Sequence, residues 1–235
     1  MSLVDFSPWT FEFKHDSAFE HALGRGGTEV FNFGCAQEFL LHIAQNLDDR
    51  GRFQNELGDR LKANSICKSW KKSRGKLAAL KEFSKYRRRH YDAYHNAALA
   101  IWAGGATAKQ TKMVRGLTAE IDMSPVVLKA GQQVFHGRSE PLPVVPQAYP
   151  SFVSTSMEPV VAANHSFKRS GPGSRPQVYI LTSNFDIRAI WGHAPGTVEW
   201  ELLLPPGLVI EEKVRRGGKA FDVVVASILS RSSPP

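Results

Sequence analysis

The sequence predicts an α+β fold in which a mainly helical front part precedes an antiparallel β core. Two observations indicate this class. Apolar residues recur at helical spacing as far as residue 122, and beyond Pro125 short β-branched or aromatic runs are separated by glycine and proline. The composition agrees, because 42% hydrophobic and 22% charged residues in a chain of 235 are typical of a globular protein with a sizeable core.

The helical spacing predicts three helices, over residues 35–47, 76–103 and 107–122. Each is followed by a stretch that stops a helix: DDRGR, Gly104-Gly105 and Ser124-Pro125, respectively. We expect strands in the runs VVLKAGQQVFHG, SFVSTS, QVYILTS, VEWELLL, LVIEEKVRR and FDVVVASIL. The Pro/Gly-rich stretches GRSEPLPVVPQAYP and FKRSGPGSRP are expected to be loops.

The net charge of +8 is unevenly distributed. Between residues 60 and 90 there are twelve lysines and arginines and one glutamate. Such a segment could meet nucleic acid, acidic lipid or an acidic protein surface. It lacks interleaved aromatic residues for stacking on bases, so we interpret it as the solvated face of helices and do not expect nucleic acid as a partner.

Several classes of protein are excluded. No stretch approaches the ~20 apolar residues of a membrane-spanning helix, and the N-terminal MSLVDFSPWTFEFKHD does not read as a signal peptide. The two cysteines, Cys35 and Cys67, fit a reducing compartment better than a disulfide framework. We find no HExxH and no paired CxxC, and therefore expect no metal. There is also no phosphate-binding loop and no nucleophile elbow of a serine hydrolase.

Three short motifs draw attention to the β core. In GTVEWELLLPPG, alternation along a strand would bury Val198, Trp200, Leu202 and Leu204 and place Glu199 and Glu201 together on the other face. The run SFVSTS carries Ser154, Thr155 and Ser156 at the end of a strand. The run QQVFHGRSE carries His136 and Arg138 on one face of another strand, on either side of Gly137. Taken singly, each motif is more often structural.

In this order the three motifs resemble the mono-ADP-ribosyltransferase family of bacterial toxins and type III effectors. The glutamate stretch, running from Glu199 to Gly207, is the most specific match, and Phe152–Ser156 is the second. The first motif departs from the arginine-specific pattern, because His136 stands where arginine is expected. The resemblance covers roughly residues 84–227. It implies an ADP-ribosyltransferase-like core of two packed antiparallel β-sheets in residues 81–235, preceded by a helical, basic N-terminal region of unknown role in residues 1–80.

The resemblance also implies a chemistry and the residues that perform it. NAD would be the substrate, and Glu201, Glu199 and Ser154 would be catalytic. Glu201 would stabilise the oxocarbenium-like transition state, and Ser154 would orient Glu201 and the nicotinamide ribose. Glu199 would take a proton from an arginine acceptor. The residues expected to bind NAD are His136, Gly137, Arg138, Thr155, Ser156 and Arg169.

The loop NFDIRAIWGHAPGT matches the stretch by which the family recognises its acceptor. Trp191 would be its exposed aromatic residue, although a core position for this tryptophan fits the sequence equally well. FKRSGPGSRP would lie over the nicotinamide and phosphates, which also gives Arg175 a possible role.

The resemblance finally implies a biological setting. The protein would be a monomeric virulence effector that enters host cells through a specialised secretion system and modifies a host protein on arginine. One alternative is a catalytically impaired effector that keeps the fold and acts by binding a host protein. Another is ADP-ribosylation of nucleic acid, for which the basic segment is the only support.

Overall fold

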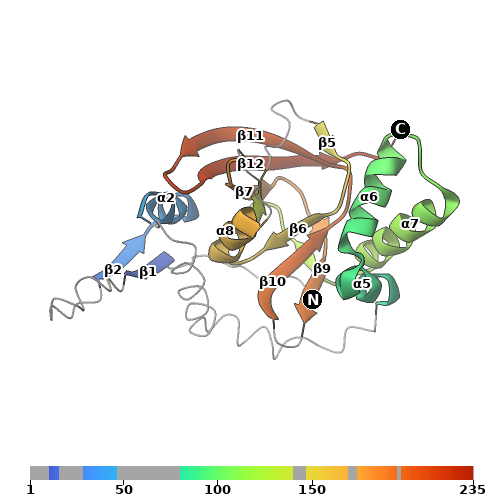
Figure 1. Ribbon diagram of the computed structural model, residues 1–235, viewed down its shortest axis with the longest axis horizontal. Helices are drawn as coiled ribbons and strands as arrows, with labels where there is room; N and C mark the ends of the chain where they lie inside the picture. Colours follow the sequence, from blue (N-terminus) through green and yellow to red (C-terminus); the bar gives the residue numbers. More distant parts are fainter. Residues whose placement is uncertain are drawn as a thin grey trace.

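The computed structural model describes residues 11–15, 29–46, 80–139, 147–168, 174–194 and 197–234 (Figure 1). Its helices are α2 (Ala36–Asn46), α5 (Lys81–Lys85), the π-helical turn η1 (Tyr86–His90), α6 (Tyr91–Trp102), α7 (Ala108–Asp122) and α8 (Pro159–Lys168). Its strands are β1 (Phe11–His15), β2 (Glu29–Phe33), β3 (Val127–Leu128), β4 (Gln133–Arg138), β5 (Gln147–Tyr149), β6 (Val153–Ser156), β7 (Gln177–Ser183), β8 (Ile187–Arg188), β9 (Ile190–Ala194), β10 (Thr197–Leu204), β11 (Leu208–Gly217) and β12 (Asp222–Arg231). The predicted α+β class is confirmed.

Eight strands form one continuous sheet in the order β5-β11-β12-β7-β4-β6-β10-β9. Most neighbours are antiparallel, but β7 and β12 run parallel. The strands β4 and β6 share a single residue pair, Phe135 with Ser156, so the sheet is divided into two halves at this junction. The two packed antiparallel sheets implied by the resemblance are observed as two halves of one mixed, mostly antiparallel sheet.

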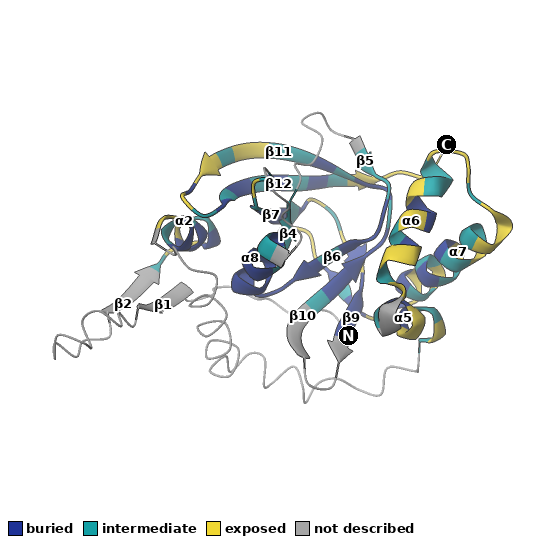
Figure 2. Cartoon of the chain, in the orientation of Figure 1, coloured by how far each residue is buried: buried dark blue, intermediate teal, exposed yellow. Residues whose placement is uncertain are grey.

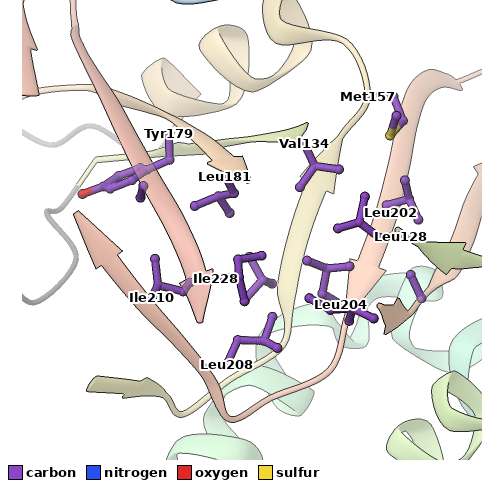
Figure 3. Close-up of a cluster of buried hydrophobic side chains, with 14 of the residues drawn as sticks. Leu128, Val134, Met157, Tyr179, Leu181, Leu202, Leu204, Leu208, Ile210 and Ile228 are labelled. Atoms are coloured by element: carbon purple, nitrogen blue, oxygen red, sulfur yellow. The ribbon is translucent and has the colours of Figure 1, made fainter. Parts of the chain in front are cut away.

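The two halves pack against each other around a shared core (Figure 3). Val134, Leu181 and Ile228 contribute to it from one half, and Leu202 and Leu204 from the other. The buried residues of this core stabilise the fold, since each large apolar side chain removed from water contributes about 1.5–3 kcal/mol.

Side chains alternate along the strands, so every second residue points away from the shared core and packs against helices. On β7, Tyr179 and Leu181 face the shared core, whereas Val178 and Ile180 join Phe39 and Phe135 in a second core beneath α2 and α8. On β10, Leu203 faces the opposite way from Leu202 and Leu204 and joins a third core beneath the helices α5, α6 and α7. The helices therefore cover the face of the sheet that is turned away from the shared core. The strands β6 and β7 are almost entirely buried, whereas β11 is exposed toward its C-terminal end (Figure 2).

The helix expected over residues 76–103 is observed from Lys81 to Trp102 as α5, η1 and α6 in direct succession, and residues 76–79 lie outside the described residues. Its N-terminal end is held by Glu120 of α7, whose two carboxylate oxygens each accept a backbone N–H bond of 2.8 Å, from Glu82 and Phe83. The helix α7 begins with a capping box between Thr107 and Gln110, as its sequence allows. Within the described part of the chain, no helix is long and apolar enough to cross a membrane.

The front part of the chain contains strands as well as a helix. Strands β1 and β2 pair as a two-stranded antiparallel sheet within a region expected to be helical. The helix α2 confirms the expected helix at 35–47 and buries Phe39, Leu40 and Ile43 completely. Because α2 packs on the same sheet as α8, it shares its core with the proposed catalytic domain. The division of the chain at residue 80 stays a prediction.

Candidate active site

A cavity of about 620 Å³ lies against the junction between β4 and β6. The helices η1 and α6 form one wall, and strand β4 and helix α8 form the other. Of the residues expected to act on NAD, those that line it are His136, Gly137, Arg138, Ser154, Thr155, Ser156 and Glu201. The fold therefore gathers three motifs that are up to 65 positions apart in the sequence, from His136 to Glu201.

The carboxylate of Glu201 is held by the neighbouring strands. On β6, the hydroxyl of Ser154 donates a 2.6 Å hydrogen bond to Glu201 Oε1. Ser154 is the diagonal cross-strand neighbour of Glu201, because the direct partners are Glu201 with Ser156 and Leu203 with Ser154. On β9, the direct partner of Glu201 is Gly192, which carries no side chain. This geometry fits the expectation that Ser154 orients Glu201.

The position of Glu199 is less regular than alternation suggests. The pairing of β10 with β9 runs from Thr197 opposite Ala194 to Glu201 opposite Gly192, so two more residues are used on β10 than on β9. Such an irregularity re-aims side chains locally. The backbone of Glu199 lies in β10, but its side chain is outside the described residues, as are those of Val198 and Trp200.

His136 is held as a neutral side chain. Its Nδ1 lies 2.7 Å from the carbonyl oxygen of Ser154. Because a carbonyl can only accept, Nδ1 carries the proton and Nε2 is left as an acceptor. Burial, assisted by the nearby charge of Arg138, lowers the pKa of His136 to about 3. His136 can thus accept a hydrogen bond from a hydroxyl, but it cannot supply positive charge at neutral pH.

Arg138 supplies that charge instead. Its guanidinium carbon lies 5.3 Å from the centre of the Tyr149 ring, within the range of a cation–π interaction. Its Nη1 is buried and has no hydrogen-bond partner among the described residues. A buried donor without a partner costs about 1–3 kcal/mol, so the side chain is ready to bind an anion. The cavity is also of a size that suits a cofactor-sized ligand. These residues therefore fit NAD.

Comparison with solved structures gives the architecture a name. The structure of the ADP-ribosyltransferase Vis of Vibrio splendidus, solved with the M6 inhibitor, is similar with a TM-score of 0.51 and 15% sequence identity, over 82% of this chain and 90% of that one. An ADP-ribosyltransferase from Clostridium botulinum, solved in a triclinic form, is similar with a TM-score of 0.50 and 13% identity, over 71% of this chain and 96% of that one. The protein has the fold of the bacterial ADP-ribosyltransferase toxins. No family model matches the sequence, and no curated protein matches it.

Within this ADP-ribosyltransferase fold, three of the expected NAD-binding residues have structural contacts of their own. A Cβ on Gly137 would lie 1.8 Å from the carbonyl oxygen of Ala162, so the close packing of α8 by itself requires glycine at this position. The hydroxyl of Thr155 donates to the carbonyl of Leu202 at 2.8 Å, joining β6 to β10 where we expected a cofactor contact. The hydroxyl of Ser156 accepts a bond from the backbone of Glu158 at the start of α8.

The expected exposure of Trp191 is wrong. The side chain is only 6% exposed and belongs to the core between the two sheet halves. It lies opposite Leu202 and belongs to the same core as Leu202 and Leu204. The core interpretation, which the sequence allowed equally, is the correct one.

The two arginines of the loop FKRSGPGSRP differ in what can be said of them. Arg169 lies outside the described residues. Arg175 forms an ion pair with Asp222, with 2.5 Å between Nε and Oδ1, and also donates to the carbonyl of Gly218. Arg175 is therefore bound to the β11–β12 hairpin and is not among the residues that line the cavity.

The helical wall of the cavity is the part that sequence reasoning did not assign. Tyr91, Asp92, His95 and Asn96 line it from α6, and Arg87 lines it from η1. His95 is held in place by Ser151, with 2.7 Å between Nδ1 and Oγ, and lies 4.0 Å from Tyr91 between ring centres. The signal was present in the sequence, because Asp92, His95 and Asn96 recur at the spacing of one helix face. Arg87 brings one residue of the basic segment to the cavity, whereas residues 60–79 of that segment lie outside the described residues.

Proposed function

We propose that this protein is a mono-ADP-ribosyltransferase that transfers ADP-ribose from NAD to an arginine of a host protein. The hydrogen bond between Ser154 and Glu201 carries the proposal, because it fixes a carboxylate at the cavity in which NAD would bind. We further propose that the protein acts as a virulence effector delivered into host cells. The fold and the toxins that share it support this assignment.

In this reaction the bond between nicotinamide and its ribose breaks, and positive charge develops on the ribose. The carboxylate of Glu201 would stabilise this charge while accepting a hydrogen bond from a ribose hydroxyl. Arg138 would bind the pyrophosphate through its unpaired Nη1, because a guanidinium offers a fork of donors to phosphate oxygens. The acceptor Nε2 of His136 would bind a hydroxyl of the adenine-side ribose.

The transfer step needs a nucleophile and a base. The guanidinium of the acceptor would attack the ribose carbon and lose one proton, which Glu199 would accept. Together the two glutamates divide the reaction, with Glu201 serving cleavage and Glu199 serving transfer.

The remaining expected site residues take supporting roles. Gly137, Thr155 and Ser156 would shape the strands around NAD, Arg169 would cover it, and the loop around Trp191 would meet the acceptor.

One experiment tests the proposal directly. The purified protein is incubated with NAD, and nicotinamide release is measured alone, with agmatine as a guanidinium acceptor, and with host-cell lysate. Labelled NAD reports incorporation into protein. Release that is stimulated by agmatine, with label on a lysate protein, is the expected result. Binding of NAD without release would reject the proposed activity and favour the catalytically impaired effector, for which the histidine at position 136 is the supporting observation.

A further inference from the structure

Gly192 lies directly opposite Glu201 on strand β9. A Cβ built on Gly192 would lie 2.5 Å from Glu201 Oε2, 2.9 Å from its Cβ and 3.1 Å from its Cδ. These contacts are shorter than van der Waals distances. The whole glutamate side chain therefore rests on the face of Gly192, where any other residue would push it away.

The two neighbours of Glu201 act on the two oxygens of its carboxylate. Ser154 on β6 bonds Oε1, and Gly192 on β9 leaves the space that Oε2 occupies. Gly192 itself is buried, and it is not among the described residues that line the cavity. Its backbone angle is not in the left-handed region, since the described glycines with positive φ are Gly104, Gly131 and Gly207. The backbone conformation therefore does not require glycine at position 192. The space occupied by the Glu201 side chain does require it.

We propose that Gly192 is a positioning residue for Glu201, acting by providing the space in which the carboxylate is held against Ser154. The kinetic consequence of this inference rests on the proposed function, but the contact between Gly192 and the Glu201 side chain is present without NAD. An added methyl group at position 192 would shift the carboxylate away from Ser154 and from the ribose it serves. A displacement of about 1 Å in a reacting group can lower a rate about 100-fold.

The kinetic test compares Gly192→Ala with the wild type. We expect the kcat of nicotinamide release to fall about 100-fold, while the KM for NAD changes little, because Gly192 does not line the cavity. Gly105→Ala is the matched control, since a Cβ at Gly105 has no atom within 4 Å and should change neither value. A wild-type rate in Gly192→Ala would overturn the proposal, as would a loss confined to KM.

The stability test does not depend on catalysis. If Gly192→Ala strains the protein through Glu201, then adding Glu201→Ala should recover much of the lost melting temperature, because the contacts with Oε2 and Cδ disappear. Ser154→Ala should lower the melting temperature of the wild type and have little effect on Gly192→Ala, in which the bond is already broken. A double variant as unstable as Gly192→Ala alone would overturn the proposal. A further outcome is that the wild type releases no nicotinamide while Glu201→Ala still restores the melting temperature of Gly192→Ala. That result would reject the proposed function and support the role of Gly192 in positioning Glu201.

Discussion

The two ends of the cavity are built in different ways. At the end lined by β6 and β10, the carboxylate of Glu201 is bonded to Ser154 and packs on Gly192 of the neighbouring strand β9. At the end formed by β4 and β5, the guanidinium of Arg138 packs on Tyr149 but leaves Nη1 buried without a partner among the described residues. The acidic group is thus positioned before a ligand arrives, whereas the basic group has a donor that the described part of the protein does not use.

This difference indicates a division of labour along the cavity. A group that acts on a transition state is most effective when its geometry is set in advance, since no reorganisation is then needed during the reaction. A group that binds the substrate can keep an unsatisfied donor, because the ligand recovers the free energy of the missing hydrogen bond. Changes at the Glu201 end should therefore lower kcat, and changes at the Arg138 end should weaken NAD binding.

The largest effect is expected at Glu201. Glu201→Gln keeps the size of the side chain and removes its charge, so nicotinamide release should fall by at least about 100-fold, while the affinity for NAD is nearly retained. Release is measured with purified protein, and affinity by calorimetric titration. Unchanged release in a folded Glu201→Gln protein would reject the role of this carboxylate.

Glu199 tests the same end of the cavity in a second way. Because we assign it to the acceptor, Glu199→Ala should lower transfer to agmatine about 100-fold and leave cleavage of NAD in water within about a factor of two. Both activities are measured in parallel on one preparation. An equal loss in the two assays would argue against the division between cleavage and transfer.

At the other end, Arg138→Lys keeps the charge and removes the planar fork of donors. The affinity for NAD should fall about 10-fold, corresponding to about 1.4 kcal/mol, with kcat at saturating NAD little changed. Arg175→Lys is a useful control, because Arg175 is paired with Asp222 on the β11–β12 hairpin. If calorimetry finds the Arg138→Lys protein unaltered, the pyrophosphate does not lie at this end.

The sequence predicted the class of the fold and the three motifs of the site because both depend on local patterns. Alternation buried Leu202 and Leu204 as expected, and the order of the motifs led to the correct fold. Alternation could not show that Leu203 is buried as well, since that depends on the helices α5, α6 and α7 packing on the other face.

Other features depended on contacts between distant segments. The glycine at position 137 suggested an approaching ligand, whereas the helix that approaches it begins more than twenty residues later. The irregular pairing between β9 and β10 is set by two strands together and weakens the inference that Glu199 and Glu201 share a face. The burial of Trp191 also depends on a contact between segments, because strand β10 lies opposite it. The sequence around Trp191 alone therefore allows both an exposed and a core position.

The smallest expected effect concerns His136, which connects the two ends by bonding Ser154 and lying near the charge of Arg138. Burial lowers its pKa to about 3 in the folded protein, whereas an unfolded histidine has a pKa of about 6.5. The unfolded chain therefore binds the proton more readily, and stability contributed by neutral His136 should be lost progressively as the pH falls from about 6.5 toward 3.

This dependence can be isolated with His136→Asn, whose side-chain amide can still donate to the carbonyl of Ser154. We expect its melting temperature to fall less steeply between pH 7 and pH 4.5 than that of the wild type. NAD affinity of the wild type should stay nearly constant between pH 6 and 8, because His136 stays neutral throughout that range. A slope that is identical in wild type and His136→Asn would mean that this histidine is not kept neutral by burial, and would remove the distinction between a hydroxyl-binding His136 and a phosphate-binding Arg138.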